Sequence, residues 1–99
     1  MGKKTCISDI IAAEPLACTI LGYLGEHYWF RGETWQGVWQ NLKTLRNGYQ
    51  FEQADAENNK NFTKARIGLL AVKKLMQAMD EAREEARKND PTLSPMDWK

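Results

Sequence analysis

The residue types that carry out covalent or acid–base chemistry are few in this chain. There are two cysteines, Cys6 and Cys18, and one histidine, His27. Nucleophilic catalysis needs a thiol or hydroxyl beside a base, and Cys18 lies in an apolar stretch where its thiol is expected to pack in the core. A single histidine among aromatic residues is more often a packed side chain near a helix end than a general base. The sequence therefore predicts no catalytic residue and a protein that is not an enzyme.

Metal and cofactor sites are not indicated either. A structural zinc site needs four ligands at short, regular spacings, and the chain has no Cys-x-x-Cys pair and no second histidine. Phosphate-binding loops of the GxGxxG or GxxxxGK[ST] type do not occur, and these are the loops that cradle nucleotides through backbone N–H groups. We expect no metal and no cofactor.

Two pairs of acids have the spacing of a helical metal motif. Glu52-x-x-Asp55 and Glu81-x-x-Glu84 resemble the acidic helix motifs of the MazG-like nucleotide pyrophosphohydrolases. In that family the motifs hold magnesium between helices, so the resemblance implies Mg-dependent nucleotide hydrolysis as an alternative function. The order of the two pairs differs from the family's ExxE-then-ExxD pattern, and a charged, solvated helix surface is the interpretation we favour.

A second resemblance starts at a tryptophan. Trp35-Gln36-Gly37 is similar to the Trp-x-Gly signature of the small secreted helical-hairpin family that is named after this motif. The resemblance implies two long helices joined by a turn that contains the motif, and export through a specialised apparatus. Here Trp35 is expected to begin a helix, and Pro15 interrupts the region of the first long helix. This family is retained as an alternative.

Helix signals recur in the first half of the chain, whereas alternating strand patterns are nearly absent. Ser8 is expected to cap a short first helix, and Pro15 suits the first turn of a second one. That second helix is predicted over 15–30. Its apolar stripe steps by four and consists of Leu16, Ile20, Leu24 and Tyr28. Thr34 then caps a third helix over 35–47, which Asn47-Gly48 is expected to end.

The longest helix is predicted near the C-terminus, over 62–88. Its apolar residues step by three and four up to Met79, and beyond that point charged residues predominate, so the last turns are expected to extend into solvent. Asp90-Pro91 ends it. The sequence thus predicts an all-α fold, a bundle of three to four helices with a long C-terminal helix. We assign 1–90 to a single helical domain and 91–99 to a C-terminal tail.

Composition narrows the function classes. A chain of 99 residues with 42% hydrophobic and 27% charged residues has the composition of a globular domain. Its net charge of +1 indicates no strong attraction to nucleic acid or to an acidic membrane. Nucleic-acid binding remains an alternative because basic side chains gather before and along the first half of the long helix. They are Lys60, Lys64, Arg66, Lys73 and Lys74.

Aromatic residues supply the candidate contact surface. The stretch HYWFRGETW, 27–35, contains four of them, and five large groups at one corner cannot all face inward. Trp35 and Tyr28 belong to predicted core stripes, which leaves Trp29, Phe30 and Arg31 as candidates for protein binding, since tryptophan, tyrosine and arginine dominate binding hot spots. Trp98 in the tail is the fourth candidate.

The functional prediction follows by elimination. We expect a small, non-enzymatic protein that binds another protein stoichiometrically, as an adaptor, inhibitor or regulatory subunit, with self-association as a further option. A phage or mobile-element origin fits such a protein. The two cysteines are too few for a disulfide scaffold and favour a reducing, cytoplasmic location. The apolar runs are too short for a membrane span.

Overall fold

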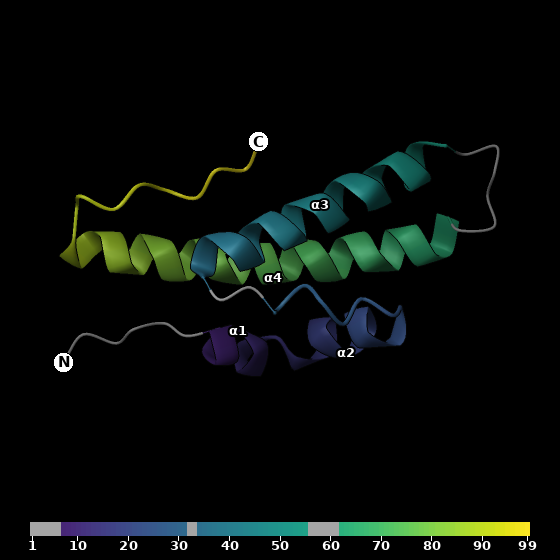
Figure 1. The fold of residues 1–99 in the computed structure, drawn as a ribbon, viewed down its shortest axis with the longest axis horizontal. Coiled ribbons are helices and arrows are strands. Elements are labelled where there is room, and N and C mark those ends of the chain that lie inside the picture. The colour runs from purple at the N-terminus through teal and green to yellow at the C-terminus, as the bar shows by residue number, and fades with distance from the viewer. Residues whose placement is uncertain (1–6, 32–33, 56–61) are drawn as a thin grey trace.

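The computed structural model describes residues 7–31, 34–55 and 62–99, which form four helices and no strand. They are α1 (Ile7–Ala13), α2 (Pro15–Tyr23), α3 (Trp35–Ala54) and α4 (Phe62–Asn89). The long helix α4 is central: α3 packs along one side of it, and α1 and α2 pack on the other (Figure 1). The molecule measures 50 × 24 × 19 Å. The prediction of an all-α bundle with a long C-terminal helix is confirmed.

The central position of α4 follows from its sequence. Its buried residues are Ala65, Gly68, Ala71, Val72, Leu75, Met76 and Met79. The small residues among them let neighbouring helices approach closely, while valine, leucine and methionine fill the space between the layers. The helix begins at Phe62 and ends at Asn89, immediately before Asp90-Pro91, as predicted. No described helix combines the length and the apolar character needed to cross a membrane.

The third helix starts as predicted but does not stop where predicted. The Thr34 side chain accepts a hydrogen bond of 2.9 Å from the Gly37 N–H, which caps the N-terminus. The helix then continues through Asn47-Gly48 to Ala54, so the predicted end is wrong. A glycine inside a helix costs only about 1 kcal/mol, and burial of Leu45 and Tyr49 on either side of Gly48 offsets that cost.

The second helix is shorter than the predicted 15–30 and ends at Tyr23. Gly25 has a φ of +84°, a left-handed conformation that favours glycine. The Glu26 N–H donates to the Leu21 carbonyl at 2.9 Å and the Gly25 N–H to the Gly22 carbonyl at 3.0 Å. This hydrogen-bond pattern is a Schellman motif, which ends a helix. Gly25 therefore marks the end of α2.

The face that α2 buries is also not the predicted one. Ala17 and Leu21 are buried, whereas Leu16 is 71% exposed and Ile20 only partly covered. Tyr28 lies beyond the helix and is exposed, so its assignment to the core is wrong as well. A similar but smaller correction applies to α1, which begins at Ile7 and therefore includes the predicted cap, Ser8.

Candidate functional site

The outward face of α2 is apolar and exposed. From Pro15 to Gly25 the sequence has no charged residue. Leu16 is 71% and Tyr23 89% exposed, and the partly buried Ile20 lies between them on the same side of the helix. Helices that are apolar on all sides are normally buried. In this molecule only one side of α2 is covered.

Acidic residues stand at both ends of this uncharged segment. Glu14 precedes α2, and Glu26 follows its C-terminal cap. The Tyr28 hydroxyl donates a hydrogen bond of 3.4 Å to Glu26 Oε2. Partial burial, followed by the charge of Glu26, raises the pKa of Tyr28 above its usual value. We call the face formed by Leu16, Ile20 and Tyr23, with its two flanking glutamates, the α2 face.

The aromatic stretch that follows α2 divides between core and surface. Trp29, a candidate contact residue, is only 2% exposed and belongs to the hydrophobic core, so its expected place on the surface is wrong. Asn41 of α3 donates to the Trp29 carbonyl at 3.2 Å, which holds this segment against α3. Phe30 is exposed and meets the Trp29 ring edge-on, with ring centroids 5.4 Å apart. Arg31 is exposed, and its N–H donates to the Tyr28 carbonyl at 3.0 Å.

The tail, residues 91–99, turns back along α3 and α4 (Figure 1). Its carbonyl groups accept hydrogen bonds from side chains of both helices. Arg87 Nε donates to the Leu93 carbonyl at 3.0 Å and Arg83 Nε to that of Ser94 at 2.8 Å. On α3, two further donors reach the tail, each at 2.7 Å: Trp39 Nε1 to the Asp97 carbonyl, and Arg46 to the Trp98 carbonyl.

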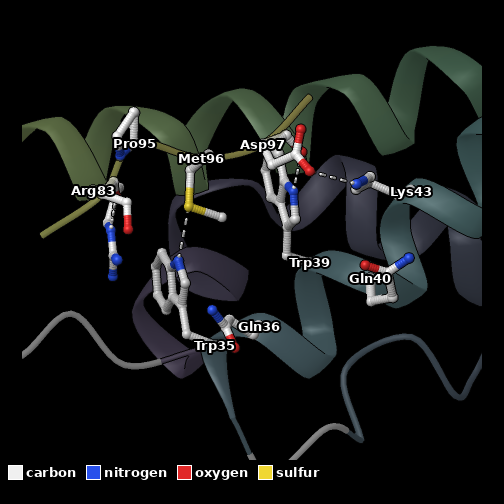
Figure 2. Close-up of a pocket in the computed structure, with 10 residues that line it drawn as sticks. Trp35, Gln36, Trp39, Gln40, Lys43, Arg83, Pro95, Met96 and Asp97 are labelled. Carbon is white, nitrogen blue, oxygen red and sulfur yellow. Dashed lines mark hydrogen bonds and ion pairs between the residues drawn. The ribbon is translucent and has the colours of Figure 1, made fainter. Parts of the chain in front are cut away.

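Side chains of the tail add apolar and ionic contacts (Figure 2). Trp35 Nε1 donates to the Met96 sulfur at 3.4 Å, and the Trp98 ring meets the Trp39 ring edge-on at 5.0 Å. The buried Lys43 forms an ion pair of 3.5 Å with Asp97. A hydrogen bond from the Lys99 N–H to Asp97, followed by the charge of Lys43, lowers the pKa of Asp97.

These contacts enclose a hollow of about 430 Å³ between the tail, α3 and α4, beside Trp35 and Trp39. Trp98, a candidate for protein binding, is therefore engaged by its own chain, with 40% of its surface still exposed. Its ring also borders a second hollow, of about 340 Å³, together with Arg46 and Lys73. The tail fastens α3 to α4 and leaves only part of the Trp98 ring open to a partner.

The basic residues of α4 do not gather on one side. Lys64, Arg66, Lys73 and Lys74 are all exposed. At roughly 100° per residue, Lys64 and Arg66 point to nearly opposite sides of the helix, and Lys74 lies between them. Lys60 is outside the described residues. Arg66 and Lys73, seven positions apart, lie on the same side of α4, opposite Lys64. Two positive charges on one side fall short of the continuous stripe that a nucleic-acid groove requires.

The residues behind the two family resemblances are not arranged as those families would require. Tyr49 contacts Gly68, whereas Glu81 lies 13 positions beyond Gly68, roughly 20 Å along α4. Glu52, less than one turn from Tyr49, is therefore far from the second acidic pair. Trp35 begins α3, and the two long helices are connected by 55–61 and not by the Trp-x-Gly segment.

The remaining candidates for chemistry lie apart from one another. The half-buried Cys18 thiol donates to the Ile11 carbonyl at 3.9 Å, and burial, followed by the nearby Glu14, raises its pKa. Cys6 is outside the described residues. His27 is exposed, with Cε1 3.8 Å from the position that a Cβ on Gly22 would occupy. Nowhere in the described part of the chain do three metal-ligating side chains come together.

Comparison with known proteins adds no relative: no family model, no curated protein and no solved structure matches this chain. The sequence did contain a signal for the α2 face, because eleven consecutive uncharged residues, 15–25, are unusual for a surface helix.

Proposed function

We propose that the protein acts by stoichiometric binding to another protein, as an adaptor, inhibitor or regulatory subunit, and that the α2 face is its contact surface. The supporting observation is the exposure of Leu16 and Tyr23 on a helix that has no charged residue. Burying apolar area is worth about 25 cal/mol per Å². A leucine and a tyrosine left exposed on the same helix face therefore represent binding free energy that the isolated chain does not use.

The flanking charges indicate what the partner presents. Glu14 and Glu26 bracket the α2 face. Charge complementarity gives specificity and speeds association, so we assign the partner an apolar ridge flanked by basic side chains. Phe30 and Arg31, exposed just beyond Tyr28, are included as secondary contacts. A cytoplasmic location belongs to this proposal, since two cysteines without a disulfide framework suit a reducing compartment.

The test compares matched surface variants. The double variant Leu16→Glu/Tyr23→Glu places charge on the α2 face, and Phe51→Glu places it on an exposed apolar residue of α3 as a control. The protein recovered with the wild-type chain from its native cell is identified, purified separately and mixed with each variant. Light scattering should give a one-to-one complex with the wild type and with Phe51→Glu, and none with the double variant.

Two outcomes would overturn the proposal. One is a complex that the double variant retains, since the contact would then lie elsewhere. The other is dimerisation of the wild-type chain at rising concentration, together with a double variant that stays monomeric. The partner would then be a second copy of this chain. Circular dichroism of each variant checks that the helices remain folded.

A further inference from the structure

A small acidic hollow lies on the flank of α3 that faces away from the tail. Thr44, Gly48 and Glu52 follow one another at intervals of four residues and form one wall of it. Glu26 and Tyr28, from the segment after α2, contribute to the opposite wall. The volume is about 220 Å³. We call this space the Tyr49 hollow, because Tyr49 also lines it.

The charges around the Tyr49 hollow are unbalanced. Two carboxylates, Glu26 and Glu52, line it, and no lysine or arginine does. Neither glutamate belongs to the ion pairs formed within residues 7–31, 34–55 and 62–99, such as Lys43–Asp97, Glu84–Arg87 and Glu85–Lys88. Within the described residues, the one hydrogen bond to either carboxylate comes from the Tyr28 hydroxyl to Glu26. Two neighbouring negative charges without a cation favour a positively charged ligand.

An unsatisfied hydroxyl provides a second, independent observation. Tyr49 is only 6% exposed, and its hydroxyl is buried without a hydrogen-bond partner. Both carboxylates line the same hollow as Tyr49. Burial, followed by the charges of Glu26 and Glu52, raises the pKa of Tyr49 to about 12. A buried hydroxyl without a partner is destabilising. Here it has a free acceptor oxygen at a site that already carries two carboxylates.

The glycine in the wall keeps the hollow open. Gly48 is in the interior of α3, where glycine is unfavourable. A Cβ on Gly48 would have no atom within 4 Å, so no packing requirement explains the missing side chain. Any larger residue at this position would project into free space on the lined flank. Gly48 is therefore a position where the hollow can be filled without disturbing the core.

We propose that the Tyr49 hollow binds a primary ammonium group, of the kind that a lysine side chain of the partner presents. An ammonium has three N–H donors and no acceptor, which matches the carboxylates of Glu26 and Glu52 and the hydroxyl of Tyr49. The phenol rings of Tyr28 and Tyr49 add the aromatic surface that cations favour. The identification with a partner's lysine rests on the proposed function, whereas the ammonium site itself can be tested without any partner.

The experiment is a titration of the whole chain with Nα-acetyl-lysine N-methylamide, followed by NMR at the Gly48 amide and the Tyr49 ring. Saturable shifts are expected. Glu52→Gln and Tyr49→Phe should each weaken binding about threefold or more, and Gly48→Leu should abolish it. Asp55→Asn, which removes a neighbouring carboxylate that does not line the hollow, should bind like the wild type. The capped norleucine analogue, which lacks the charge, should cause no saturable shift.

Other titration results would overturn the ammonium site. One is an absence of saturation with the wild-type chain, and another is an affinity equal to that of the wild type in both Glu52→Gln and Gly48→Leu. Tighter binding of the capped arginine analogue would make it a guanidinium site and overturn the ammonium assignment. A titration with butane-1,4-diamine tests whether the ligand is a free small amine. If this diamine bound ten times more tightly than the capped lysine, the assignment to a partner's lysine would be overturned.

The two proposals fail separately. The double variant Leu16→Glu/Tyr23→Glu should lose the partner protein yet keep the lysine analogue, because neither residue lines the Tyr49 hollow. If Gly48→Leu folds poorly by circular dichroism, Gly48→Ala adds a single methyl group to the same wall and should still weaken binding.

Discussion

Replacing glycine by alanine should raise the stability of the protein at one position, Gly48, and lower it at another, Gly68. Gly48 in α3 and Gly68 in α4 both occupy helix interiors. A Cβ on Gly48 meets nothing within 4 Å, whereas a Cβ on Gly68 would stand 2.6 Å from both Cε2 and Cζ of Tyr49. Gly48→Ala therefore gains helix propensity alone. Gly68→Ala gains the same propensity but forces a buried ring to move.

The magnitudes can be estimated from these contacts. Alanine is favoured over glycine in a helix by about 1 kcal/mol, which corresponds to a rise in Tm of roughly 4–8 °C for a domain of this size. Overpacking a core costs about 1–3 kcal/mol. The overlap with Tyr49 involves two ring carbons of a side chain with little room to move, so the upper part of that range applies. Gly68→Ala is expected to lower the free energy of unfolding by about 1–2 kcal/mol after the propensity gain.

Thermal and urea denaturation followed by far-UV circular dichroism would measure both changes. A third measurement isolates the cause: in a Tyr49→Leu background the ring is absent, and Gly68→Ala should no longer destabilise the protein. If Gly68→Ala stabilised the wild type as much as Gly48→Ala does, the Tyr49 ring would not rest on Gly68. Helices α3 and α4 would then lie farther apart at this point than the structure places them.

The other predictions concern single buried or tail residues. Tyr49→Phe should stabilise the chain by about 1 kcal/mol in urea denaturation, because it removes a buried hydroxyl without a partner; it should also remove the loss of stability expected as the pH rises from about 10 to about 12, since the folded pKa is the raised one. Trp29→Ala should lower the free energy of unfolding by about 3–5 kcal/mol because the ring is buried. An unchanged urea midpoint would contradict the burial of this ring. The folded pKa of Asp97 is lowered, so its contribution to tail docking is present above the usual aspartate range and lost as the pH falls through the folded value. Tryptophan fluorescence should report this acid transition in the wild type, and its persistence in Asp97→Asn would contradict the assignment.

Much of the fold was predictable because α4 and the start of α3 have one dominant apolar face each. Apolar residues spaced by three and four along α4 indicate an amphipathic helix. Asp90-Pro91 and Thr34 are strong local signals for helix ends. Asn47-Gly48 does not end α3 because a local stop signal can be overridden by the packing of its neighbours. The burial of Tyr49, one residue later, contributes more than the glycine costs.

The site was less predictable, for physical reasons. On α2, the Leu16 side and the Leu21 side are both apolar, so periodicity gives the helix but not which side meets α4. Trp29 lies in a segment without regular structure, where no period predicts which side chains face inward, although its ring is only 2% exposed in the structure. The tail is bound mainly through its carbonyl groups, which every residue has, so no sequence pattern could reveal its docking.

The tail contacts have a consequence for the order in which the molecule opens and closes. Its first half is tied to nearby residues of α4, six and eleven positions away, whereas its second half reaches α3 across 52 to 61 positions. Contacts between distant residues form late in folding, since the long loop must close first. Segments with few buried contacts also exchange their amide hydrogens through local openings. The chain beyond Ser94 should therefore dock last and detach first. Each detachment exposes two indole N–H groups, an ammonium and a guanidinium in a row along α3 while the helices stay folded.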